Sequence, residues 1–158
     1  MNKVKFLFLL AFVALMGCKS EDVFDEQEQL AIDVKLIQDY LQANDINAQQ
    51  IEDTGIYYVI YQEGTGPNAE FASSVFTHYR GYLLDQTEFD SSTGSGPFDF
   101  VIGAGQVIRG WELGFRQLNK GASATLFIPS KYGYGTNRQG LIPANSVLIF
   151  DVDVVDIR

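Results

Sequence analysis

From Gly55 to the last residue, the chain is a succession of short runs rich in β-branched and aromatic residues, each bounded by Gly, Pro, Asn or Ser. Such runs are typical of β-strands separated by turns. The expected strands are residues 56–61, 75–84, 98–102, 124–128 and 147–157. Only residues 107–118 among them have the spacing of a helix. Several short strands with one short helix predict an α+β architecture, in which an antiparallel sheet covers the helix.

The segment before Gly55 has a helical period instead. Apolar side chains recur there at spacings of four, three and four residues: Leu30, Val34, Ile37 and Leu41. Glu28, Asp33 and Asp39 fall outside this stripe, so we expect one amphipathic helix over 26–43. Its function is either to pack against the domain or space it from a membrane, or to form a homodimer. The stripe lasts less than three heptads, which favours the first interpretation, and we expect the rest of the chain to fold without residues 19–50.

The N-terminus has the layout of a secretory signal. Lys3 and Lys5 precede an uninterrupted apolar run of eleven residues at 6–16, shorter than the about twenty residues of a membrane-spanning helix. The sequence LMGC at 15–18 resembles the lipobox of bacterial lipoproteins. We therefore expect a signal peptide over 1–17 and a lipid anchor on Cys18. The several acyl chains that bacterial lipoproteins carry would hold the protein stably at the membrane. The alternative is a cleaved signal followed by an incidental Cys.

The segment after Cys18 is strongly acidic. Residues 18–54 carry ten acids and two bases, whereas residues 55–158 carry ten acids and seven bases. The first of these segments is interpreted as an acidic tether and helix, and the second as the C-terminal domain. The start of the tether resembles a signal that sends Bacteroidota lipoproteins to the cell surface, although a solvated tether explains it equally well. The expected location is the cell envelope, on the periplasmic or surface face of the outer membrane.

Several function classes are excluded by composition and by missing motifs. A net charge of −9 disfavours nucleic acid as a partner, because phosphate binding depends on Lys and Arg. The single Cys permits no intramolecular disulfide and no Cys-based zinc site. No phosphate loop, dinucleotide fingerprint or nucleophile elbow is present. His78, in the middle of an expected strand, is interpreted as structural, so we expect no metal and no cofactor.

Aromatic residues are dense in the C-terminal two thirds of the chain: Tyr79, Phe89, Phe98, Phe100, Trp111, Tyr132, Tyr134 and Phe150. Some must form the core, but so many rings beside one small sheet also indicate an apolar binding pocket between sheet and helix. They occur in an ordered series of motifs: FDSS at 89–92, PFDFVIG at 97–103, QVIRGWE at 106–112, YGYG at 132–135, LIP at 141–143 and LIFDV at 148–152. From about residue 56 to 157, this series resembles the FKBP-type peptidyl-prolyl cis-trans isomerases.

The resemblance implies a curved antiparallel sheet wrapped around the short helix, with the substrate pocket between them. Trp111 would form the floor of the pocket. Its walls and rim would come from seven residues: Tyr79, Phe89, Phe98, Val107, Leu141, Ile142 and Phe150. The Ile108 backbone N–H and the Tyr134 hydroxyl would hold the carbonyls on either side of the substrate proline, and Asp90 would lie near the isomerising carbonyl. The segment between Ser92 and Pro97 lacks the Arg that usually pairs with this Asp.

The function implied is isomerisation of X-Pro bonds in exported proteins, with proline-containing polypeptides as partners and no cofactor. Two alternatives use the same fold differently. One is a binding module or chaperone that holds proline-containing chains, and the other is a scaffold lipoprotein of an envelope assembly. The enzyme is favoured because seven pocket residues are present together: Tyr79, Asp90, Phe98, Ile108, Trp111, Tyr134 and Phe150.

Overall fold

The structure is a computed structural model that describes residues 25–158. The signal peptide, the lipobox and Cys18 predicted above lie outside these residues. Within them, no helix is both long and apolar enough to cross a membrane. The elements, in chain order, are α1 (Glu26–Ala43), β1 (Gln49–Gln50), β2 (Tyr57–Gln62), β3 (Thr65–Asn68), β4 (Ser74–Tyr82), β5 (Glu88–Ser91), β6 (Phe98–Val101), α2 (Arg109–Gly114), the 3₁₀ turn η1 (Phe115–Gln117), β7 (Asn119–Lys120), β8 (Ser123–Ile128), the 3₁₀ turn η2 (Ser130–Tyr132) and β9 (Leu148–Ile157).

The strands form one large antiparallel sheet of seven strands in the order β1-β2-β8-β9-β4-β5, with β6 paired to β4 beyond the end of β5. A separate two-stranded sheet joins β3 to β7. The α+β architecture is confirmed, and each of the five expected strands is present within two residues of its expected ends. Four short strands were not predicted, because two to four residues carry too little periodicity to be detected: β1, β3, β5 and β7.

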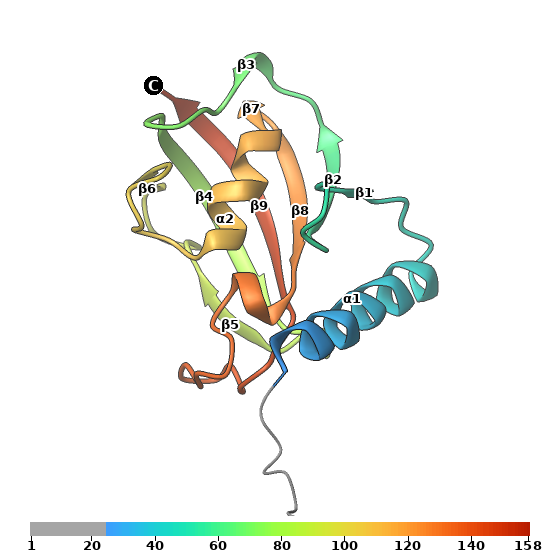
Figure 1. The fold of residues 1–158 in the computed structure, drawn as a ribbon. Coiled ribbons are helices and arrows are strands. Elements are labelled where there is room, and N and C mark those ends of the chain that lie inside the picture. Colours follow the sequence, from blue (N-terminus) through green and yellow to red (C-terminus); the bar gives the residue numbers. More distant parts are fainter. Residues whose placement is uncertain (1–24) are drawn as a thin grey trace, which may run out of the picture.

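The inner face of the sheet packs on α2 (Figure 1). The helix predicted over 107–118 is shorter than expected, because it begins at Arg109 and gives way to η1 after Gly114. Two glycines let it approach β8 closely. A Cβ on Gly110 would lie 2.4 Å from Ile128 Cγ2, and one on Gly114 would lie 2.6 Å from Leu126 Cδ1. Both contacts are too short for any larger side chain, so the close packing of α2 on the sheet depends on glycine.

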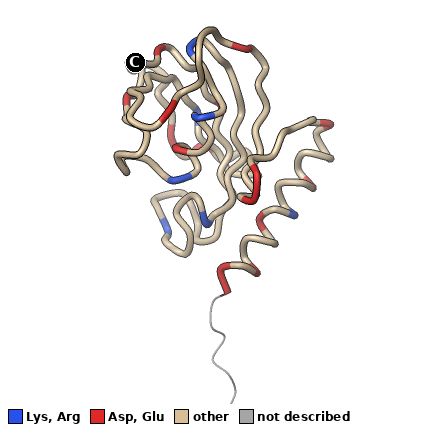
Figure 2. Tube along the Cα trace, turned by 45° about the horizontal axis from the view of Figure 1, so that its top comes forward, with Lys and Arg blue, Asp and Glu red and all other residues tan. Residues whose placement is uncertain are grey.

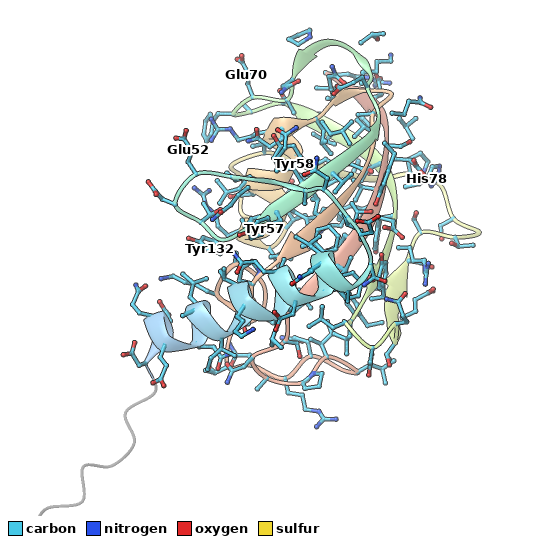
Figure 3. The ribbon with its side chains drawn as sticks, turned by 90° about the vertical axis from the view of Figure 1, so that its right-hand side faces the viewer. Glu52, Tyr57, Tyr58, Glu70, His78 and Tyr132 are labelled. Atoms are coloured by element: carbon cyan, nitrogen blue, oxygen red, sulfur yellow. The ribbon has the colours of Figure 1, made fainter. Side chains whose placement is uncertain are left out.

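The outer face of the same sheet packs on α1. Figure 3, turned so that α1 faces the viewer, shows this helix lying across the sheet beside Tyr57. Ile37 and Leu41 of α1 are buried in a second hydrophobic cluster with sheet side chains that include Phe127 and Ile149. The sheet is therefore covered on both faces, and α1 belongs to the folded body. This packing argues against our expectation that the rest of the chain folds without residues 19–50, because a chain without α1 would expose the outer cluster.

Asp33 of α1 faces the core, although it was expected to lie outside the buried stripe. Asp33, placed outside the apolar stripe by its polarity, is fully buried. The other charges of the helix are at its surface, as Figure 2 shows along its length, and Lys35 pairs with Asp39 one turn later. Asp25 caps the N-terminus of the helix by accepting hydrogen bonds from the N–H groups of Gln27 and Glu28.

Candidate functional site

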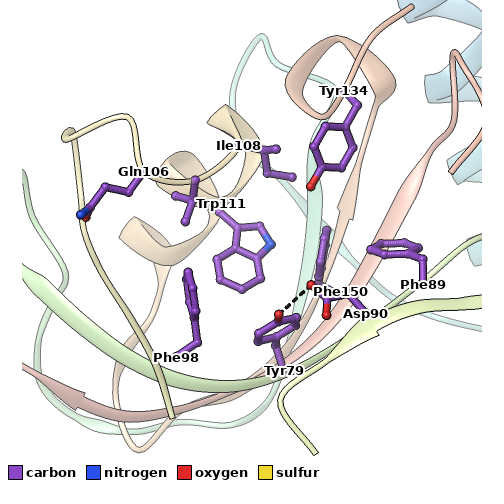
Figure 4. Close-up of a pocket in the computed structure, with 10 residues that line it drawn as sticks. Tyr79, Phe89, Asp90, Phe98, Gln106, Ile108, Trp111, Tyr134 and Phe150 are labelled. Carbon is purple, nitrogen blue, oxygen red and sulfur yellow. Dashed lines mark hydrogen bonds between the residues drawn. The ribbon is translucent and has the colours of Figure 1, made fainter. Parts of the chain in front are cut away.

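A cavity of about 400 Å³ lies between α2 and the sheet (Figure 4). This volume falls within the range of small-molecule sites, about 300–1,000 Å³. Its lining comes from β4, β5, β6, β9, the loop before α2, α2 itself and the segment after η2: Tyr79, Phe89, Asp90, Phe98, Gln106, Val107, Ile108, Trp111, Tyr134 and Phe150. Nine of these ten residues were predicted from the sequence.

Trp111 is the centre of the aromatic part of the pocket. Its ring meets those of Tyr79, Phe98 and Phe150 edge to face, with centroids 5.1, 5.9 and 5.2 Å away. Such edge-to-face pairs add stabilisation beyond the burial of apolar area. Since Trp111 itself is only 4% exposed, its contacts hold the floor of the cavity in one orientation.

The indole of Trp111 carries a second feature. Its Nε1–H is buried and has no hydrogen-bond acceptor within residues 25–158. Buried Trp donors usually find a partner, and an unpaired one costs free energy. Buried polar groups without a hydrogen-bond partner are found at functional sites more often than in ordinary cores.

Three polar groups line the pocket, two of them paired with each other. The Tyr79 hydroxyl donates to Asp90 Oδ2 at 2.7 Å, and Figure 4 shows the Tyr134 hydroxyl directed into the cavity from the opposite side. Tyr79 therefore orients the Asp90 carboxyl. Burial, then the hydrogen bond and charge of Asp90, raise the pKa of Tyr79 to about 12. Burial and the Asp90 charge also raise the pKa of Tyr134, so both hydroxyls remain donors at neutral pH.

We expect the Tyr79 hydroxyl to lose its proton only near pH 12. Its pKa is higher in the folded protein than the unfolded value near 10, so its stabilisation is fully present below pH 10 and is lost as the pH rises toward 12. The near-ultraviolet phenolate absorbance of the parent minus that of Tyr79→Phe measures this titration. In Asp90→Val the same titration should move to lower pH. If the midpoint of the Tyr79 titration were the same in Asp90→Val as in the parent, Asp90 would not contribute to the raised pKa.

The loop before α2 is held by a buried carboxylate. Glu112 Oε1 accepts hydrogen bonds from the N–H groups of Gly103 and Gly105, both at 3.2 Å, and Oε2 accepts from Arg109 at 2.8 Å. The hydrogen bond from Arg109 is the main cause that lowers the pKa of Glu112. This loop leads to Ile108, the N-cap of α2, whose extended backbone keeps its N–H outside the helical hydrogen bonds.

Gln106 is the lining residue that sequence reasoning missed. It directly precedes Val107 within the QVIRGWE motif, and this adjacency was the only signal. Gln106 Oε1 accepts a hydrogen bond from the Val101 N–H at 2.8 Å. It thereby ties the end of β6 to the loop at the rim.

The structure does not bring Leu141 and Ile142 into the lining of the cavity. Ile142 is 5% exposed and packs in the main hydrophobic core. Leu141 points to solvent and is 64% exposed. The cause is a tight turn, in which Gln139 and Ile142 exchange both backbone hydrogen bonds, at 3.0 and 2.7 Å.

His78 lies outside the pocket lining. Its Nδ1 is 3.3 Å from Ser92 Oγ, which also accepts a hydrogen bond from the Tyr79 N–H, so its surroundings fit the structural interpretation. Among residues 25–158, no three His, Cys, Asp or Glu side chains gather as metal ligands would.

A sheet closed around a short helix, with an aromatic pocket between them, is the architecture that the motif series implied. Residues 66–155 match the FKBP-type peptidyl-prolyl cis-trans isomerase family. The chain belongs to this family of enzymes.

Curated relatives fall into two groups by length. The FKBP-type peptidyl-prolyl cis-trans isomerase FkpA of Buchnera aphidicola is 41% identical over 107 residues, which cover 66% of this chain and 42% of that protein. FK506-binding protein 1 of Gibberella zeae is 42% identical over 106 residues, covering 63% of this chain and 96% of the relative. The FK506-binding protein of Neisseria meningitidis is 40% identical, with coverages of 61% and 90%. The chain thus spans less than half of FkpA but nearly all of the short relatives.

Proposed function

We propose that this protein catalyses rotation about X-Pro bonds of exported proteins, with the proline bound in the aromatic pocket. The observation that carries the proposal is the cavity itself. Its floor and walls include the rings of Trp111, Tyr79, Phe98 and Phe150, and the Asp90 carboxyl and the Tyr134 hydroxyl lie beside them. A proline ring is apolar and fits such a surface, whereas the amides on either side of it need hydrogen-bond partners.

The barrier to rotation is amide resonance, about 18–20 kcal/mol. Twisting the X-Pro bond removes this resonance and leaves a less polar amide. A pocket with aromatic walls favours the twisted form over the polar planar one, which lowers the barrier by differential binding. The reaction breaks no σ bond, so this mechanism uses no nucleophile.

Hydrogen bonds on both sides of the proline confine the rotation to one bond. In the proposal, the Ile108 N–H holds one flanking carbonyl and the Tyr134 hydroxyl holds the other. Both residues line the cavity, which supports these roles. Asp90, oriented by Tyr79, would act on the isomerising amide through its charge.

Tyr134→Phe is expected to lower kcat/KM about two- to tenfold, because one hydrogen bond of about 0.5–1.5 kcal/mol is lost while the ring remains. Asp90→Val should also lower it, since the charge beside the amide is removed. A protease-coupled assay on X-Pro peptides measures both, and binding of FK506, the ligand named in several relatives, reports whether the pocket stays formed. Parental rates in both variants would contradict the catalytic roles and favour a binding module.

We further propose that Cys18 carries a lipid anchor that holds the enzyme at the outer membrane. The apolar run at 6–16 behind two lysines and the LMGC sequence support this. Cys18→Ser is expected to move the protein from the membrane fraction to a soluble or unprocessed form and to abolish lipid labelling. Unchanged fractionation and labelling of the variant would overturn the anchor.

A further inference from the structure

The turn that leads to Tyr134 is held from the other face of the sheet by a buried carboxylate. Asp33 of α1 is fully buried, and its Oδ2 accepts hydrogen bonds from the Ser130 N–H at 2.8 Å and from the Ser130 hydroxyl at 2.6 Å. Its Oδ1 accepts from Gln29 Nε2 at 2.8 Å. Both oxygens of this carboxylate are therefore satisfied, and two of its three hydrogen bonds go to one residue that lies 97 positions later in the chain.

Ser130 passes this constraint to Tyr134. Its carbonyl accepts hydrogen bonds from the N–H of Gly133 at 2.9 Å and from the N–H of Gly135 at 2.8 Å. These are the residues directly before and after Tyr134. All three polar groups of Ser130 are thus used, two toward Asp33 and one toward the backbone on both sides of the pocket tyrosine.

Two further backbone hydrogen bonds hold the segment around Tyr134: the Tyr134 carbonyl accepts from the Asn137 N–H at 3.0 Å, and the Gly135 carbonyl accepts from the Asn145 N–H at 2.7 Å. Neither of them joins the turn to α1. Gly133 has an unusual backbone conformation, with φ −107° and ψ −116°, and Gly135 has a positive φ of 56°. Glycine is flexible in both regions, so the path of the chain around Tyr134 depends on its hydrogen bonds. The remaining link to α1 is an ion pair at 3.2 Å between Lys131 and the exposed Glu26, which contributes little because it is open to solvent.

We infer that Asp33 is a positioning residue for the isomerase reaction, acting through Ser130 to fix the place of the Tyr134 hydroxyl. The inference rests on the role proposed above for Tyr134. Asp33 lies outside the 66–155 segment that matches the isomerase family. Helix α1 would then be more than a cover for the sheet, because it would set the geometry of one of the two substrate contacts.

A double-mutant cycle on the full chain tests this inference. Asp33→Ala should lower kcat/KM for an X-Pro peptide about two- to tenfold, and by no more than Tyr134→Phe does. In the Tyr134→Phe background, Asp33→Ala should cause no further loss, because the hydroxyl that it positions is already gone. If Asp33→Ala does not fold, Ser130→Ala replaces it. That variant removes one of the two donors and should show a smaller loss with the same dependence on Tyr134.

Two matched variants separate positioning from stability. Asp33→Asn keeps an acceptor oxygen for both Ser130 donors, since Gln29 can turn its amide to match, and should retain the parental rate. Ile37→Ala, one turn further along α1, removes buried packing from the outer cluster. It should lower the unfolding temperature but leave kcat/KM unchanged below that temperature.

The outcomes distinguish the inference from the proposal on which it rests. A reduced rate for Tyr134→Phe beside a parental rate for Asp33→Ala would overturn the positioning role alone. The positioning role would also be overturned if Asp33→Ala lowered kcat/KM by the same factor in the Tyr134→Phe background as in the parent. An equal fall of kcat/KM in Ile37→Ala would overturn it too. A parental rate for Tyr134→Phe would overturn the role of Tyr134, and the positioning role with it.

Discussion

A fragment that begins at Glu52, and so lacks α1, is expected to lose several kcal/mol of unfolding free energy relative to a chain that begins at Ser20. Ile37 is fully buried and Leu41 is 7% exposed. At about 1.5–3 kcal/mol for each large apolar side chain, these two alone correspond to about 3–6 kcal/mol. Typical domains have only about 5–15 kcal/mol in total, so the fragment should be marginally stable or unfolded.

Urea unfolding followed by circular dichroism measures this difference. The matched control is the double variant Ile32→Ser with Leu36→Ser on the exposed side of α1, where the two side chains are 48% and 43% exposed. Surface changes of this kind are usually within about 0.5 kcal/mol. A fragment from Glu52 with the unfolding midpoint of the longer chain would show that the outer cluster contributes nothing to stability.

Trp111→Ala is expected to lower the free energy of unfolding by about 3–5 kcal/mol, the usual effect of truncating a buried aromatic residue. The variant loses the edge-to-face contacts with Tyr79, Phe98 and Phe150 at once, and the pocket floor becomes a void. Its isomerase activity should fall as well, but part of that loss would come from unfolding. Trp111→Leu refills some of the volume and is the cleaner probe of catalysis.

Circular dichroism is the suitable readout, because Trp111 is the only Trp in the chain and its fluorescence disappears with it. Tyr61→Ala serves as the control, since Tyr61 is also aromatic but 65% exposed and should change stability by less than about 0.5 kcal/mol. Equal destabilisation by the two truncations would mean that Trp111 is not an element of the core. A parental rate in folded Trp111→Leu would mean that the floor is not needed for catalysis.

Most of the pocket could be predicted because its residues lie in contiguous motifs that resemble those of the isomerase family, and strand geometry agrees with the directions that the resemblance implied. Tyr79 and Phe150 alternate with outward-facing neighbours on paired strands, so their direction follows from the pleat. Leu141 and Ile142 lie in a loop instead, where a turn decides which side chain points inward. No spacing rule gives the direction of a side chain there, and the turn sends Leu141 to solvent and Ile142 into the core.

Asp33 could not be predicted for a different reason. Helical spacing places Asp33 beside Val34 at the edge of the apolar stripe. Because Asp33 is charged, its side chain was expected to be exposed to solvent. The observed burial is possible only because Ser130 supplies two donors to it. A polar residue becomes buried when a partner satisfies it, and a partner 97 residues away leaves no trace in the local sequence.

The position of β9 has a consequence for the order in which the molecule assembles. This last strand lies between β8 and β4 in the middle of the sheet, and it supplies Phe150 to the pocket. The contacts that close both cores therefore join distant parts of the chain, a topology associated with slow folding. The chain is synthesised from its N-terminus, so α1 is made before the sheet. Its apolar side stays exposed until most of the strands have been made and paired. The pocket becomes complete only when the final strand has inserted.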